Sequence, residues 1–122
     1  MPSTKVSFDT VREIALAMPG VEESTAYGQP ALKLRGQLLA CLPSHRSAEP
    51  GSLVLRLDFS DRAELLAGDP SAYYITEHYR NYPTVLVRLG RMKPSLLKDL
   101  LTMSYKFVAG KSKAAPRSKK SR

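Results

Sequence analysis

The chain has 122 residues, of which 43% are hydrophobic and 25% are charged, and this composition suits one domain with its own hydrophobic core. Its single cysteine, Cys41, excludes an intramolecular disulfide scaffold and fits a reducing compartment. The sequence shows neither a signal-peptide pattern nor an apolar run of membrane-spanning length, so we expect a cytoplasmic protein without membrane contacts.

The formal net charge of +8 is concentrated near the C-terminus. Residues 110–122 contain no acid, and we expect them to form a disordered basic tail outside a single domain over residues 1–109. Within that domain, cations exceed acids by only two. The tail is either an arm that attracts DNA phosphates or a solubilising extension. Its cations are Lys111, Lys113, Arg117, Lys119, Lys120 and Arg122.

Hydrophobic periodicity predicts the elements in chain order. They are a helix over 7–18, a connector over 21–30, a hairpin over 31–42, a strand over 52–59, a helix over 60–68, strands over 73–75 and 84–89, and a helix over 94–109. Ser7 and Ser60 are the predicted caps of the first two helices. The residues predicted to point toward the core include Val11, Ala15, Phe59, Leu97 and Leu101. This order, α-β-β-β-α-β-β-α, predicts an α+β domain of two layers. An antiparallel sheet would carry the helices on one face.

The predicted hairpin has a two-residue turn at Gly36-Gln37, which would pair Arg35 with Leu38. Alternate residues of a strand share a face, so this register assigns every side chain of the hairpin to one side. One face would hold the core residues Leu32, Leu34, Leu39 and Cys41, and the other would hold Lys33, Arg35, Leu38, Ala40 and Leu42.

The sheet face away from the helices is predicted to be open and cationic. Strand alternation gives it Lys33, Arg35, Arg56 and Arg88, with apolar residues between them, including Leu38, Leu42, Val54 and Leu86. Such a face suits sequence-nonspecific DNA binding, with Arg80 reaching in from a turn. It also suits a protein-interaction module or a homodimer. A third interpretation is an ordinary solvated face, on which Lys and Arg stems cover apolar surface.

The turn before the strand over 84–89 gathers His78, Tyr79 and Arg80, and these three residues are candidates for a small-ligand pocket. A histidine in a turn also often binds only backbone carbonyls. No pair among Cys41, His45 and His78 has a usual zinc spacing, so no metal site is expected. The register places the Cys41 thiol in the core, where it would be inert. The glycines are isolated rather than grouped in a phosphate-binding loop. We therefore expect a non-enzymatic protein without a cofactor.

Several short motifs in this order resemble those of the MmcQ/YjbR-like family of small bacterial proteins, and the resemblance covers residues 7 to about 109. The motifs are Met18-Pro19-Gly20-Val21-Glu22-Glu23, Ala26-Tyr27-Gly28-Gln29-Pro30, Lys33-Leu34-Arg35-Gly36, Leu55-Arg56, Arg62, Asp69-Pro70, Thr76-Glu77-His78-Tyr79-Arg80, Tyr82-Pro83 and Val85-Leu86-Val87-Arg88-Leu89.

The resemblance implies a two-layer α+β domain that is DNA-binding-like, with a winged surface and no established enzymatic activity. It supplies no motif of DNA contacts, so the choice of binding residues above comes from charge and strand parity. Glu77 also looks acidic in relatives, and an acid at that point counts against phosphate contacts by the turn itself.

Overall fold

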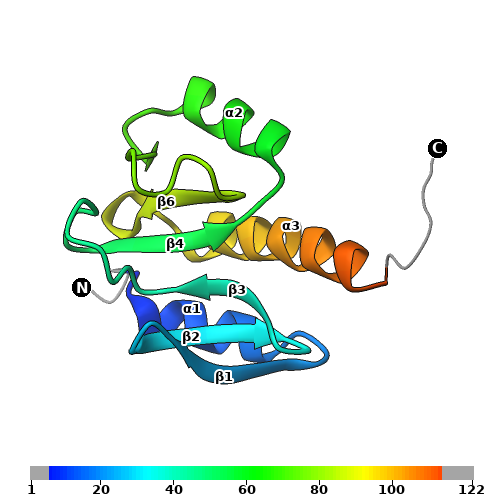
Figure 1. Ribbon diagram of the computed structural model, residues 1–122. Coiled ribbons are helices and arrows are strands. Elements are labelled where there is room, and N and C mark those ends of the chain that lie inside the picture. The colour runs from blue at the N-terminus through cyan, green and yellow to red at the C-terminus, as the bar shows by residue number, and fades with distance from the viewer. Residues whose placement is uncertain (1–5, 114–122) are drawn as a thin grey trace.

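The structure is a computed structural model that describes residues 6–113, with side chains described for residues 6–110. Three helices and a six-stranded antiparallel sheet form two layers, which confirms the predicted α+β class (Figure 1). The elements are α1 Phe8–Leu16, β1 Val21–Ala26, β2 Gln29–Leu34, β3 Gln37–Cys41, β4 Ser52–Arg56, α2 Phe59–Gly68, β5 Tyr73–Tyr74, β6 Thr84–Arg88, the 3-10 helix η1 Leu89–Arg91 and α3 Pro94–Lys113.

The sheet has the strand order β1-β2-β3-β4-β6-β5, and β1 is the strand that the prediction omitted. Residues 21–26, predicted as part of a connector, pair along their whole length with β2. The sequence pattern concealed this strand because β1 lies at an edge of the sheet, where only Val21 is buried. A strand with exposed residues on both sides lacks the alternation that identifies a half-buried strand.

The hairpin of β2 and β3 turns one residue earlier than predicted. Leu34 pairs with Gln37, so Arg35 and Gly36 form the two-residue turn. Lys33 pairs with Leu38 but Leu32 pairs with Ala40, which leaves Leu39 as an extra residue in β3. This β-bulge reverses the alternation beyond it. The prediction that Cys41 shares a face with Leu39 is therefore wrong.

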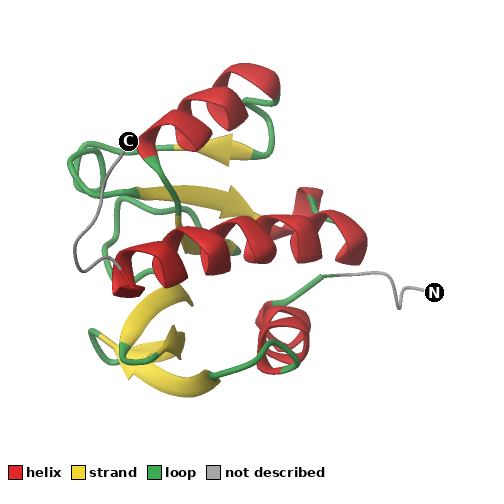
Figure 2. Ribbon diagram, turned by 90° about the vertical axis from the view of Figure 1, so that its right-hand side faces the viewer, coloured by secondary structure: helices red, strands yellow, loops and turns green. Residues whose placement is uncertain are grey.

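The face of the sheet toward α1 and α3, called the inner face, holds the main hydrophobic core (Figure 2). Fully buried leucines from the strands meet fully buried leucines of α3, which crosses the sheet beside α1. The core residues include Leu32, Leu34, Leu53, Leu55, Val85, Val87, Leu97 and Leu101. Burying each such side chain contributes roughly 1.5–3 kcal/mol.

Several element ends differ from the sequence prediction. β4 ends at Arg56, and Phe59, predicted to point inward, is 46% exposed as the first residue of α2. The carboxylate of Asp58 caps this helix, rather than the predicted Ser60. The predicted domain limit at residue 109 falls short of the end of α3, which continues to Lys113. Ser7 caps α1 as predicted, by accepting a hydrogen bond from the Asp9 amide.

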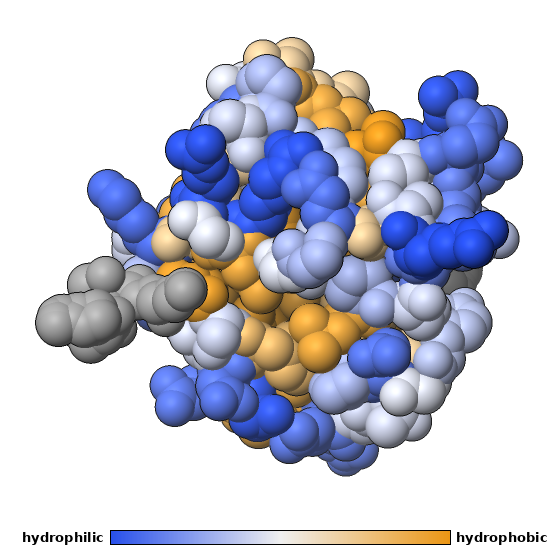
Figure 3. All heavy atoms as spheres, turned by 90° about the vertical axis from the view of Figure 1, so that its left-hand side faces the viewer, coloured by the Kyte–Doolittle hydropathy of each residue, from blue (hydrophilic) through white to orange (hydrophobic). Residues whose placement is uncertain are grey.

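The surface is mixed rather than uniformly polar. On the side shown in Figure 3, hydrophobic residues reach the surface in the middle of the view, and hydrophilic residues surround them.

None of the helices in the described part of the chain has the length and apolar character that a membrane span requires.

Candidate functional site

The outer face of the sheet, opposite α1 and α3, is partly covered by the chain itself. Ala31, Cys41, Val54, Tyr79 and Leu86 form a second buried hydrophobic cluster on this face. Ala48 and Ile75, from the segments that follow β3 and β5, pack against the cluster. Of the apolar strip predicted for a homodimer, Val54 and Leu86 are 4% and 0% exposed, whereas Leu38 and Leu42 are half-buried.

A cavity of about 490 Å³ opens on the outer face. Leu38, Cys41, Val54, Arg56 and Thr84 line it from the strands. The remaining lining residues come from the β1–β2 turn and from the segments after β3 and β5, and they are Tyr27, Pro43, Ser44, His45, His78, Tyr79, Tyr82 and Pro83. Its volume lies in the range of roughly 300–1,000 Å³ that is typical of small-molecule sites.

Two histidines from distant parts of the chain stack in the wall of this cavity. The rings of His45 and His78 lie 3.7 Å apart between centroids and only 8° from parallel. The ring of Tyr79 meets both imidazoles edge to face, at 6.3 Å from His45 and 4.8 Å from His78. Edge-to-face contact is a favoured arrangement of aromatic rings, so Tyr79 stabilises the histidine pair.

Hydrogen bonds fix the His45 ring and join the two covering segments. The backbone amide of Ser47 donates to His45 Nδ1, and the Ser47 hydroxyl lies 2.8 Å from both Nδ1 and the Thr76 hydroxyl. Desolvation lowers the pKa of His45 below its ordinary value, and the charges of His78 and Arg46 lower the pKa further. His45 is therefore held as a neutral imidazole near neutral pH.

Thr84 lines the cavity, and its hydroxyl is shielded from solvent. Its side chain is buried, and Oγ1 has no hydrogen-bond partner among the described residues. An unsatisfied buried hydroxyl costs roughly 1–3 kcal/mol. Arg62 of α2 holds the backbone at this point, because its guanidinium donates to the carbonyls of Tyr82 and Thr84 at 3.0 and 3.1 Å.

Two cations of the outer face lie at or near the cavity. Arg56 lines it, and Lys33 lies close enough to Cys41 for its charge to affect the thiol. Strand pairing puts both cations on the outer face, because Lys33 alternates with Ala31 and Arg56 with Val54. Arg35 is exposed in the β2–β3 turn. Arg80, predicted to reach in from a turn, is not a lining residue and makes an exposed ion pair with Glu77 at 3.2 Å.

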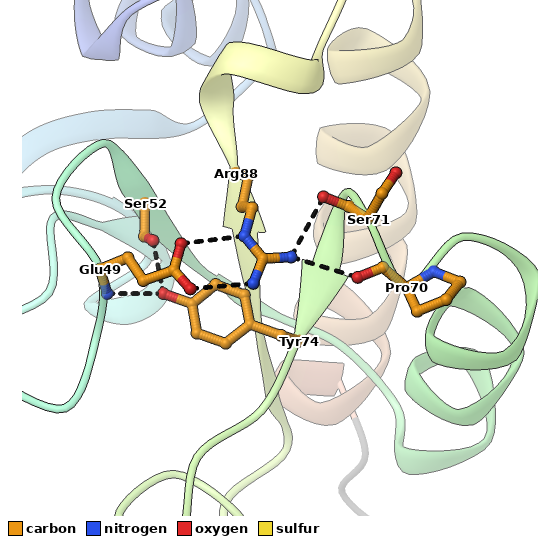
Figure 4. Close-up of polar contacts among 6 residues, drawn as sticks. All are labelled: Glu49, Ser52, Pro70, Ser71, Tyr74 and Arg88. Carbon is orange, nitrogen blue, oxygen red and sulfur yellow. Dashed lines mark hydrogen bonds and ion pairs between the residues drawn. The ribbon is translucent and has the colours of Figure 1, made fainter.

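Arg88 also faces the outer side, but its guanidinium is occupied within the chain (Figure 4). Two nitrogens donate to the Glu49 carboxylate at 2.9 Å each, and a third donates to the carbonyls of Pro70 and Ser71 at 3.1 Å. The guanidinium also lies 4.3 Å from the ring centroid of Tyr74. These contacts leave Arg88 little capacity to bind an external phosphate.

The described side chains include neither a deprotonated thiol nor a cluster of metal ligands. Burial raises the pKa of Cys41 to about 11, so the thiol stays protonated near neutral pH. Among residues 6–110, no group of three or more histidine, cysteine, aspartate or glutamate side chains could hold a metal ion.

The predicted ligand triad is only partly brought together, since His78 and Tyr79 line the cavity while Arg80 does not. The missed residues are His45, Thr84 and Tyr27. No local signal identified them, because their proximity depends on how the strands and covering segments are arranged.

The six predicted tail cations lie outside the described side chains. Of these, Lys111 and Lys113 belong to the last turn of α3.

Comparison with known proteins gives matches of sequence and of fold. The family model described as YjbR matches residues 16–107. Uncharacterized protein Mb2600 of Mycobacterium bovis and Uncharacterized protein Rv2570 of Mycobacterium tuberculosis are each 38% identical to the chain over 47 residues. That stretch is 38% of this chain and 36% of each relative, so the chain matches about a third of their length.

A solved structure extends the likeness to almost the whole fold. The crystal structure of Deinococcus radiodurans protein DR2400, described with the domain DUF419, superposes with a TM-score of 0.73 and covers 94% of this chain and 87% of that one. The sequences are 21% identical, so this likeness concerns the fold alone. Because the YjbR model spans most of the chain, from the end of α1 into the last turns of α3, the protein belongs to the YjbR family.

Proposed function

We propose that the protein binds DNA without sequence preference through the outer face of its sheet. The observation that carries the proposal is the combination of cations and exposed tyrosine rings around one cavity. Lys33 and Arg56 lie on the outer face, and Tyr27 and Tyr82 line the cavity while being 86% and 58% exposed. Cations bind the phosphate backbone, and exposed aromatic rings stack on bases.

The cations chosen for this role differ from the sequence prediction in one respect. Arg88 is left out, because Glu49 and two backbone carbonyls occupy its guanidinium. Arg80 is retained, since its ion pair with Glu77 joins side chains that are 62% and 85% exposed. Solvent-exposed pairs of this kind contribute little energy, so a phosphate can replace the carboxylate.

Salt dependence provides the test. The double variant Lys33→Gln/Arg56→Gln removes two proposed phosphate contacts, and we expect the slope of log affinity against log salt to become less steep by about two units for duplex DNA. Fluorescence anisotropy over a salt series measures this slope. The control variant Lys98→Gln/Lys106→Gln removes two exposed charges from α3, on the opposite layer. Equal effects of both pairs would contradict the proposed face.

The tail is tested by deletion of residues 114–122, which start after the last residue of α3. This deletion removes four cations, Arg117, Lys119, Lys120 and Arg122. If all four bind phosphates, the slope should become less steep by about four units. An unchanged slope would assign binding to the sheet face without the tail.

A further inference from the structure

The unsatisfied hydroxyl of Thr84 is the feature of the cavity that its own chain does not explain. Thr84 is 6% exposed, it lines the cavity, and Oγ1 lacks a partner among the described residues. Native structures leave few buried polar groups unsatisfied, and those that remain call for a ligand, a water molecule or a functional role. Oγ1 itself is shielded from the open cavity, so a ligand in the cavity would satisfy this hydroxyl only if the Thr84 side chain turned about χ1.

Flat aromatic surfaces surround the same space. Tyr79 and the stacked pair of His45 and His78 form one wall, and Tyr27 and Tyr82 add two further rings. Tyr27 has a φ of 53°, a left-handed conformation that is costly for a bulky side chain. Asn or Asp would suit this turn position better, so the sequence has an exposed ring where the backbone conformation favours a smaller residue.

We propose that the cavity accepts one unpaired base of single-stranded DNA, and that the protein therefore prefers single strands to duplexes. This inference rests on the DNA binding proposed above. A base is planar, carries donors and acceptors on its edge, and stacks on tyrosine and histidine rings. Lys33 and Arg56 supply the positive charge that the flanking phosphates require.

The accessibility of the bases explains the preference. A base within a duplex is stacked and paired, so it reaches a cavity only after it has been flipped out of the helix. A single strand needs no such step, because its bases are already free to rotate. Duplex DNA can still contact the exposed cations around the cavity, so weaker, phosphate-based binding remains.

Binding is measured by fluorescence anisotropy with a short labelled oligothymidylate, the matching duplex, and an abasic oligomer with the same phosphates. We expect the full-length protein to bind the oligothymidylate on the order of tenfold more tightly than the abasic oligomer, which is the effect of about one stacked base. Thr84→Val should reduce affinity for the oligothymidylate several-fold and leave affinity for the abasic oligomer unchanged.

Two further variants separate loss of binding from loss of folding. Thr84→Ser keeps the hydroxyl, and we expect it to retain the wild-type preference. Tyr27→Asn removes a ring while suiting the positive φ of the turn, so binding should weaken although the melting temperature is maintained or increased. Melting curves of all three variants test whether the fold is intact.

The outcomes distinguish this inference from the function on which it rests. Equal binding of the oligothymidylate and the abasic oligomer, with loss in Lys33→Gln/Arg56→Gln, would overturn the base site and leave phosphate binding intact. Thymidine monophosphate binding as tightly as the oligothymidylate would also overturn it, in favour of a free-nucleotide site. An absence of binding to every DNA would overturn both proposals.

Discussion

Arg88 is the residue whose role changed most between sequence and structure. The strand pattern predicts that Arg88 is a solvated cation, yet its guanidinium makes four N–H···O contacts within the chain. They join β6 to Glu49, in the segment before β4, and to Pro70 and Ser71, in the turn before β5. The Tyr74 hydroxyl extends this network, since it lies 2.6 Å from the Ser52 hydroxyl and accepts the Glu49 amide proton.

We expect Arg88→Lys to lower the melting temperature almost as much as Arg88→Ala. A lysine ammonium cannot make a bidentate contact with Glu49 while also reaching two carbonyls, because it lacks the planar fork of donors. Thermal unfolding followed by circular dichroism provides the measurement. The control is Arg80→Ala, which removes an exposed surface ion pair and should change stability little. A wild-type melting temperature for Arg88→Lys would show that a positive charge at this position is sufficient for stability.

At the scale of elements, the two hairpin turns have an unusual composition in common. Tyr27-Gly28 and Arg35-Gly36 both have positive φ at their two central residues, with φ of 53° and 78° in the first and 52° and 80° in the second. Turns of this kind favour Asn-Gly, because Asn tolerates the left-handed region better than most residues. Each turn therefore presents a large side chain at a conformational cost.

We expect Arg35→Asn to raise the free energy of unfolding by about 0.5–1 kcal/mol, because the turn would lose its strained residue. Urea denaturation of the variant and the wild type measures the difference. Gln37→Asn is the matched control, because Gln37 is exposed and belongs to β3, where Asn is unfavourable. A stability gain from Gln37→Asn, or a loss from Arg35→Asn, would contradict this account of the turn.

At the scale of the whole molecule, two segments distant in sequence partly cover the outer face. The segment after β3 supplies His45, Ser47 and Glu49, and the segment after β5 supplies Thr76 and Tyr79. Contacts between these segments consist largely of hydrogen bonds and stacked rings rather than aliphatic packing. The inner face, in contrast, is held by aliphatic burial against α1 and α3.

Because polar contacts hold the covering segments on the outer face, we expect the stability of the fold to decrease in acid. The hydrogen bond from Arg88 lowers the pKa of Glu49 below its ordinary value near 4.5, and the Ser71 hydroxyl is the main cause of the lowered pKa of Asp69. A carboxylate whose folded-state pKa is depressed stabilises the fold fully above its unfolded-state pKa. This contribution is lost as the pH falls through the folded-state pKa.

We therefore expect urea stability to fall below about pH 4.5, and to fall less in Glu49→Gln than in the wild type. At neutral pH the variant should be the less stable of the two, because its amide cannot accept the charged bidentate contact. Superimposable pH profiles for both proteins, apart from a constant offset, would rule out Glu49 as a source of the acid sensitivity.

Much of the fold followed from periodicity, and the errors have local causes. Val11 and Ala15 in α1, and Leu97 and Leu101 in α3, are buried at their predicted positions because their spacing matches a helix. The missed strand β1 is exposed along most of its length. The wrong face predicted for Cys41 came from a bulge at Leu39, which leaves no mark in the alternation of a short leucine-rich strand.

The candidate site was predictable only in part. Strand parity assigned Lys33 and Arg56 to the outer face, because that assignment depends only on alternation within each strand. The stacking of His45 on His78 could not be predicted, since these residues lie 33 positions apart and neither belongs to a strand. The same holds for the ion pair of Arg88 with Glu49, whose partners are 39 positions apart.

The sequence by itself determined the α+β class, the main core and the side of the sheet on which most cations lie. These features depend on local periodicity and on the side to which each side chain of a strand points. Only the tertiary structure decided which cations are free, which histidines meet and where a cavity forms. Those outcomes depend on loop paths, on a bulge and on contacts between distant segments, which short-range patterns do not contain.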